Sequence, residues 1–234
     1  MRFVLMVLSL CAAMSSTTVY ADTPHRVLVE LFTSQGCSMS RSANSHLGEL
    51  AKRNDVLALT FHVNYWDYLG WKDTFAHDDF VKRQKKYIAS LSSRKAYTPQ
   101  MVINSLHDVV GSKINDVNET IRGETALNSL VRVSSRERGS RMEVTLASKS
   151  GSLAKAADVF AVYYIPSAVV EVTSGENAGQ RLVFSNVVTR IRNLGKWSGT
   201  TNWTHDFSAP EGLKTAIIVQ LVDQGPVLTS VVLK

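Results

Sequence analysis

Two short apolar runs near the start of the chain, Val27–Thr33 and Val56–His62, are separated by a segment with helical periodicity. The apolar residues of that segment recur on one helical face: Ala43, Leu47, Leu50 and Ala51. Runs rich in β-branched and apolar residues are typical of buried strands. Two strands joined by a helix form a right-handed parallel βαβ unit. The beginning of the chain is therefore expected to form helices packed on a sheet.

The same alternation continues to about residue 124. A helix is predicted to begin at Asp78, where Asp78 and Asp79 are suitable capping residues. Short strands are predicted at Met101–Ile103 and near Asp108–Gly111, and a last helix follows them. The expected order of elements is strand, helix, strand, helix, strand, strand, helix.

After residue 124 nearly every segment has the pattern of a strand. Seven short apolar runs are separated by turn sequences, and they are Leu130–Val133, Met142–Leu146, Val159–Ile165, Val169–Val172, Leu182–Phe184, Ala216–Val222 and Val227–Leu233. Strands at such spacing predict a sandwich or a partial barrel. We therefore expect two regions, at residues 25–124 and 125–234.

Residues 1–21 have the layout of a secretory signal peptide. A basic start at Arg2 precedes an apolar run that is too short to cross a membrane, and Val19-Tyr20-Ala21 offers small residues for cleavage. The mature chain is expected to be periplasmic or secreted, without stable membrane insertion. Its net charge is mildly positive, and its basic clusters have no interleaved aromatic residues, so nucleic acid is not an expected partner.

After removal of the signal peptide, which contains Cys11, one cysteine remains, and it lies at the junction of the first strand and the first helix. A helix N-terminus presents unpaired N–H groups and a partial positive charge, which would stabilise a Cys37 thiolate. Ser40 is expected to add a hydroxyl hydrogen bond to the sulfur, and Gly36 permits the sharp turn before it. A lone thiol cannot form an internal disulfide, so Cys37 is either inert and buried, reactive, or paired with another molecule.

Tyr65, Trp66, Tyr68 and Trp71 follow the second strand closely. We interpret most of them as packing residues of an irregular segment, with Tyr65 and Trp66 as candidates for a substrate-binding wall beside the thiol.

His62 is a further candidate for substrate binding, although a buried, hydrogen-bonded structural role is the stronger interpretation. Cys37, His62 and Asp67 would supply three zinc ligands, but no close-spaced ligand pair exists, so no metal is expected. Asp67 is expected to pin the turn. No nucleotide or hydrolase motif is present, and no cofactor is predicted.

The element order, with Cys37 at the first strand-to-helix junction, resembles the thioredoxin fold. That resemblance implies that Thr98-Pro99 forms a cis-proline loop facing Cys37. The sequence also resembles domain-of-unknown-function family 1223, a family of secreted bacterial proteins with a thioredoxin-like region. The matching stretches are Val29–Cys37, His62–Asp73, Tyr97–Gln100, Gly175–Gly179 and Asn186–Val188.

One departure from the family concerns its usual Cys-x-x-Cys followed by proline, because Ser40 replaces the second cysteine and Arg41 the proline. Without a second thiol the protein cannot cycle between a dithiol and an internal disulfide.

We therefore predict an α+β protein, a thioredoxin-like domain followed by a β-sandwich-like region, with two hypotheses for its function. In the first, Cys37 exchanges with a protein or low-molecular-weight thiol or disulfide, assisted by Ser40 and Pro99, with Thr98 positioning the substrate. In the second, the chain is a non-catalytic binding module that has lost the redox pair.

Overall fold

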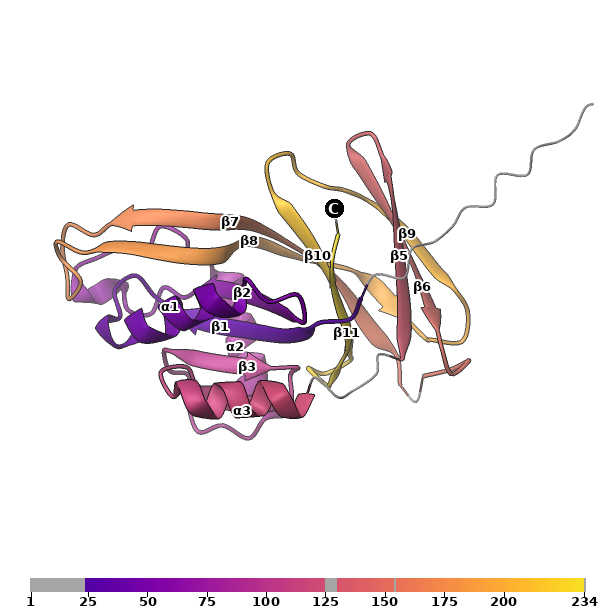
Figure 1. Cartoon of the computed structure of the whole chain (residues 1–234), viewed down its shortest axis with the longest axis horizontal. Helices are drawn as coiled ribbons and strands as arrows, with labels where there is room; N and C mark the ends of the chain where they lie inside the picture. Colours follow the sequence, from indigo (N-terminus) through magenta and orange to yellow (C-terminus); the bar gives the residue numbers. More distant parts are fainter. Residues whose placement is uncertain (1–23, 125–129, 154, 234) are drawn as a thin grey trace, which may run out of the picture.

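The computed structural model describes residues 24–124, 130–153 and 155–233 and has the predicted α+β architecture (Figure 1). The signal peptide predicted at residues 1–21 lies outside the described residues. Residues 125–129, which follow the predicted boundary between the two regions, also lie outside them. The first half contains β1 (Val27–Thr33), η1 (Ser38–Ser40), α1 (Arg41–Leu50), β2 (Val56–His62), η2 (Asp67–Leu69), α2 (Asp78–Ser90), β3 (Gln100–Ile103), β4 (His107–Val110) and α3 (Ile114–Glu124). The second half contains β5 (Val131–Arg138), β6 (Arg141–Ser148), β7 (Ala157–Glu171), β8 (Arg181–Trp197), β9 (Trp203–Ser208), β10 (Lys214–Leu221) and β11 (Val227–Val232).

The first half has the predicted order of elements. β1 and β2 pair in parallel from Val27↔Val56 to Thr33↔His62. β3 is antiparallel to β1, and β4 is antiparallel to β3. The apolar faces of α1 and α3 pack on one side of this sheet, and α2 packs on the other. This arrangement brings the end of β1 and the beginning of β3 to the same edge of the sheet.

The strands of the second half extend the same sheet. The eight-stranded order is β11-β10-β7-β8-β2-β1-β3-β4, so β8 lies against β2. The seam has one backbone pairing, Thr60↔Val187. Side chains reinforce it, because Thr60 donates to the Ser185 carbonyl and Asn186 donates to the Ala58 carbonyl.

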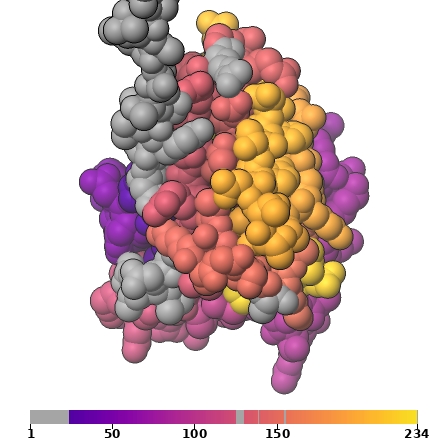
Figure 2. Space-filling model, turned by 90° about the vertical axis from the view of Figure 1, so that its right-hand side faces the viewer, coloured from indigo at the N-terminus to yellow at the C-terminus, as the bar shows by residue number. Residues whose placement is uncertain are grey.

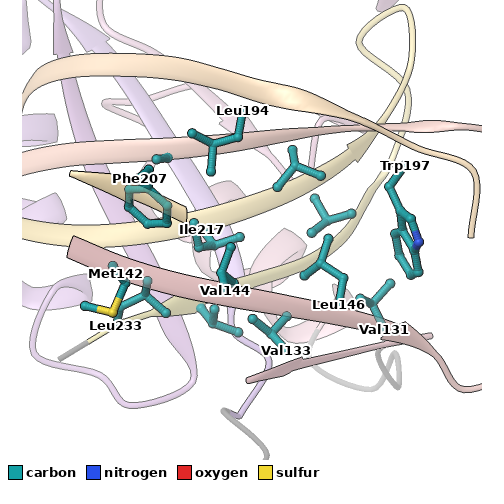
Figure 3. Packing of buried hydrophobic residues seen from close by; sticks show 14 of the residues in the cluster. Val131, Val133, Met142, Val144, Leu146, Leu194, Trp197, Phe207, Ile217 and Leu233 are labelled. Atoms are coloured by element: carbon teal, nitrogen blue, oxygen red, sulfur yellow. The ribbon is translucent and has the colours of Figure 1, made fainter. Parts of the chain in front are cut away.

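The remaining strands form a separate sheet in the order β5-β6-β9, which packs against the odd-numbered residues of β7 and β10. Figure 3 shows the core between the two sheets, where Val144, Leu146 and Phe207 face Ile217 and Trp197. Two sheets packed face to face agree with the predicted sandwich-like region. Figure 2 views this end of the molecule, where residues of the second half fill the centre of the face.

β7 and β8 are much longer than the sequence predicts, and they cross the molecule from the small sheet to α1 (Figure 1). Two predicted strands, Val159–Ile165 and Val169–Val172, are one strand that contains Pro166. β10 pairs with β7 only as far as Tyr164, so β7 is free on that side at Pro166 and the missing N–H costs no ladder bond there. β9 was not predicted. Within the described ranges no helix is long and apolar enough to cross a bilayer.

Candidate functional site

Cys37 lies in the turn between β1 and the short helix η1, which leads directly into α1. Its N–H donates to the Ser34 carbonyl at 3.2 Å, and its carbonyl accepts the Ser40 N–H at 3.2 Å. The thiol is free, and the residue is 3% exposed. The predicted position of Cys37 between a strand and a helix is therefore confirmed. Its side chain is buried, so the sulfur is not freely accessible from solvent.

The sulfur faces the segment that precedes β3. Cys37 Sγ lies 4.0 Å from the Thr98 carbonyl oxygen, which accepts the weak S–H donor. The Thr98–Pro99 peptide bond is cis, as the thioredoxin resemblance implies. Trp66 joins this group, because its Nε1–H donates to Thr98 Oγ1 at 2.7 Å. Cys37, Trp66, Thr98 and Pro99 thus converge.

Ser40 does not make the predicted bond to the sulfur. Its Oγ is buried and has no hydrogen-bond partner among the residues that the structure describes. The hydroxyl was placed from its spacing in the sequence, but a three-residue spacing does not fix the rotamer.

The aromatic residues beside the thiol are partly buried. Burial raises the pKa of Tyr65 to about 12, and the neighbouring Cys37 adds to this rise. The Tyr65 ring lies against Trp66, and Trp66 stacks on Tyr68, whose side chain is exposed. These residues form a wall that runs from the thiol to the surface.

His62 does not belong to that wall. Its side chain is fully buried, and its ring packs edge-on against Phe75 and Phe184. Nδ1 is 2.8 Å from Asp73 Oδ2. The structural interpretation of His62 is therefore correct, and its inclusion among substrate contacts is not supported because its side chain does not reach solvent.

The loop before Cys37 is held by Gln35, which sequence reasoning missed. Its N–H donates to Asp73 Oδ2 at 2.7 Å, the oxygen that His62 also contacts. Its side-chain Oε1 accepts from Trp71 Nε1 at 2.8 Å. Asp67 Oδ1 accepts the Asp73 N–H, so Asp67 pins this turn as predicted. In the described part of the chain, no group of three or more His, Cys, Asp or Glu side chains could hold a metal ion.

The turn between β7 and β8 reaches the same loop from the second half of the chain. Glu176 Oε2 accepts from Ser38 Oγ at 2.8 Å and from Ser38 N–H at 3.4 Å. Asn177 Nδ2 donates to the Gln35 carbonyl at 2.8 Å. Ser174 Oγ donates to the Gly70 carbonyl at 2.6 Å. The residues on both sides of Cys37 are therefore held by a turn that the sequence indicates as a turn and a family stretch, Gly175–Gly179, without placing it beside Cys37.

Gly175 allows the turn between β7 and β8 to lie close to Leu69 and Trp71, and this gives a testable prediction. Its φ is +74°, and a Cβ there would lie 3.1 Å from the Leu69 carbonyl oxygen. We expect Gly175→Ala to lower the free energy of unfolding by about 1–3 kcal/mol, from left-handed strain and the close contact together. Urea unfolding measures the loss, and hydrogen exchange at the Ser38 amide reports on the turn.

Gly179→Ala is the matched control for that substitution. Gly179 has a similar φ of +78°, but a Cβ there would have no atom within 4 Å. The strain is then common to both variants, and only Gly175→Ala adds the clash. Equal losses in the two variants would contradict the role of the close contact.

The comparisons with known proteins agree with this architecture. The model of a family described as "Protein of unknown function (DUF1223)" matches residues 28–222. A crystal structure of a protein from Agrobacterium tumefaciens is 25% identical with a TM-score of 0.77, and the match covers 91% of this chain and 96% of that one. HBP35 of Porphyromonas gingivalis is 10% identical with a TM-score of 0.60 over 90% of this chain and 75% of that chain, which is similarity of fold alone. A search of the curated proteins gives no match.

Proposed function

The chain belongs to the DUF1223 family of proteins of unknown function, and we propose that it is an exported thioredoxin-like protein that carries out thiol–disulfide exchange through Cys37. The observation that carries the proposal is the approach of Cys37 Sγ, at the start of a helix, to the Thr98 carbonyl at 4.0 Å. A thiol at that position faces a backbone segment beside which an extended substrate can lie.

The exchange proceeds in two steps that need one protein thiol. The Cys37 thiolate attacks one sulfur of a substrate disulfide, forms a mixed disulfide, and releases the other sulfur as a thiolate that takes up a proton. The thiolate of a low-molecular-weight thiol then attacks the substrate sulfur of the mixed disulfide. A new disulfide forms between this thiol and the substrate half, and Cys37 is released as a thiolate. The partner is a protein or small-molecule disulfide in the periplasm or outside the cell.

A non-catalytic binding module is the second candidate, and the burial of Cys37 favours it. At 3% exposure the sulfur needs some movement of its surroundings before a disulfide can reach it. In this alternative, the wall of Tyr65 and Trp66 beside Pro99 binds a peptide or a partner protein without any reaction at Cys37.

The two candidates predict opposite reactivities for the same thiol. We expect bis(2-hydroxyethyl) disulfide to modify Cys37 faster in the folded protein than in the urea-unfolded protein at the same pH, because the folded site holds the sulfur beside the Thr98-Pro99 segment, where a bound disulfide is oriented for attack. Intact-protein mass spectrometry measures the adduct, and Cys37→Ser in the mature protein should form none. A folded protein that reacts more slowly than the unfolded chain would support the binding module.

A further inference from the structure

A negative charge is held at the residue that follows Cys37. Glu176 lies 138 positions from Ser38 in the sequence, yet its Oε2 accepts both the hydroxyl and the backbone N–H of Ser38. The turn that carries Glu176 is itself fixed by Asn177 on the Gln35 carbonyl and by Ser174 on the Gly70 carbonyl. The carboxylate is therefore positioned by the fold although Glu176 is at the surface.

A cation that bonds the same residue, Ser38, is held less firmly. Arg41 Nε donates to the Ser38 carbonyl at 3.4 Å, and this residue is exposed. A single long hydrogen bond leaves a flexible side chain mobile in solvent. Of the two exposed charged side chains that bond Ser38, Glu176 and Arg41, Glu176 has the better defined position.

Unpartnered polar atoms surround the same loop. Ser40 is 0% exposed and Asn177 is 2% exposed, and Ser40 Oγ and Asn177 Oδ1 have no hydrogen-bond partner among the described residues. Buried polar groups without a partner are rare in native structures and call for an explanation. Ser40 lies three residues after Cys37, and Asn177 bonds the carbonyl of Gln35, two residues before it, so both unpartnered atoms adjoin the loop that a molecule approaching the sulfur would meet.

We propose that Glu176 determines which disulfides react at Cys37, by favouring cationic substituents over anionic ones. This inference rests on the proposed exchange function. A disulfide that contacts Cys37 brings its substituents within a few ångströms of the next residue, where Glu176 is held. Glu176 is exposed, so with the dielectric constant of water one unit charge at about 4 Å changes the rate by about three- to ten-fold.

Three disulfides of similar length test this selectivity: cystamine is cationic, bis(2-hydroxyethyl) disulfide is neutral and 3,3′-dithiodipropionate is anionic. The second-order rate of adduct formation at Cys37 is measured for each by intact-protein mass spectrometry at low salt. Because the charge speeds the cation and slows the anion, we expect Glu176→Gln to lower the ratio of the cystamine rate to the dithiodipropionate rate by about ten- to a hundred-fold. Glutamine keeps an acceptor oxygen for Ser38, so the charge is the main change.

Glu49→Gln is the matched control. Glu49 is an exposed carboxylate near the far end of α1, paired with Lys52, and it should leave the rate ratio unchanged. In the wild-type protein, 1 M salt should shrink the ratio, because the screening length falls to about 3 Å. The salt series needs no substitution, so it tests the charge effect even if Glu176→Gln disturbs the fold.

The outcomes separate the two proposals. An unchanged ratio in Glu176→Gln, with normal adduct formation, would overturn the role of Glu176 and leave the exchange function standing. The absence of an adduct with all three disulfides would overturn the exchange function and the selectivity with it.

Discussion

Replacing Arg83 by methionine is expected to lower the free energy of unfolding by about 3–5 kcal/mol, because it leaves the carboxylate of Glu30 buried without its partner. Glu30 is 0% exposed and lies in the middle of β1, and Arg83 of α2 is 6% exposed. Arg83 donates to both oxygens of Glu30, with Nε to Oε1 at 2.7 Å and Nη2 to Oε2 at 3.0 Å.

The pair belongs to a larger buried network. Tyr87 donates a short hydrogen bond to Glu30, and Gln220 of β10 accepts from Arg83 at 3.3 Å. Burial, the largest single influence, would lower the pKa of Arg83, but the charge of Glu30, the interaction with Tyr87 and the hydrogen bonds to Glu30 together outweigh burial and raise it. The network therefore connects β1, α2 and β10 across both halves of the chain.

Two further variants check that prediction by denaturant unfolding. Lys82→Met removes a neighbouring cation of α2 that pairs with Asp79 at the surface, and it should cost much less than Arg83→Met because the pair is exposed to solvent. Replacing Glu30 by leucine together with Arg83→Met should recover much of the loss, because no buried charge is left unpaired. A loss below about 1 kcal/mol for Arg83→Met alone would contradict the prediction.

Replacing Ser40 by cysteine is expected to create a dithiol reductase activity. The wild-type site lacks the second thiol that this activity requires. Ser40 is fully buried, and its hydroxyl makes no hydrogen bond, so a sulfur of similar shape loses no interaction there. Residues three apart in a 3₁₀ turn are about 6 Å apart along the axis and lie on one face, within the range of about 4.4–6.8 Å that disulfides require. The new thiol can then resolve a mixed disulfide on Cys37.

The gain is measured as the rate of insulin reduction by the variant, with dithiothreitol as the electron donor. Mass spectrometry detects the internal disulfide as a loss of two hydrogens. Ser42→Cys is the matched control, because Ser42 is exposed on α1 and five residues from Cys37. It adds a thiol without the required spacing and should give no increase. A Ser40→Cys protein that folds but forms no internal disulfide would contradict the expected geometry of the site.

Elements with strong local patterns were predicted accurately. The strands Val27–Thr33 and Val56–His62 have the predicted bounds, because fully buried parallel strands are nearly continuous apolar runs. β9 was missed because it is short and has few apolar residues: only Trp203 and Phe207 are apolar, and they alternate with exposed polar residues of the small sheet. The length of β7 was missed because Pro166 normally ends a strand, and only the sheet order shows that it lies on an unpaired side.

The candidate site was predicted in part. The convergence of Cys37 with Thr98 and Pro99 was implied by the thioredoxin resemblance, in which an antiparallel third strand begins where the first strand ends. The hydrogen bond of Ser40 to the sulfur was wrong because side-chain rotamers depend on packing that no spacing specifies. The contact of His62 with Asp73 depends on how the irregular loop after β2 folds back.

By itself, the sequence determined the types and order of most elements, the position of the thiol at the start of a helix, and the absence of a second cysteine at Ser40. Those properties depend on neighbours a few positions apart along the chain, which periodicity and turn residues record. The tertiary structure alone decided that β8 joins β2 and that Glu176 and Asn177 enclose the loop of Cys37. Such contacts join residues more than a hundred positions apart, and they arise from the pairing of strand edges and the burial of side chains, for which a local pattern carries no signal.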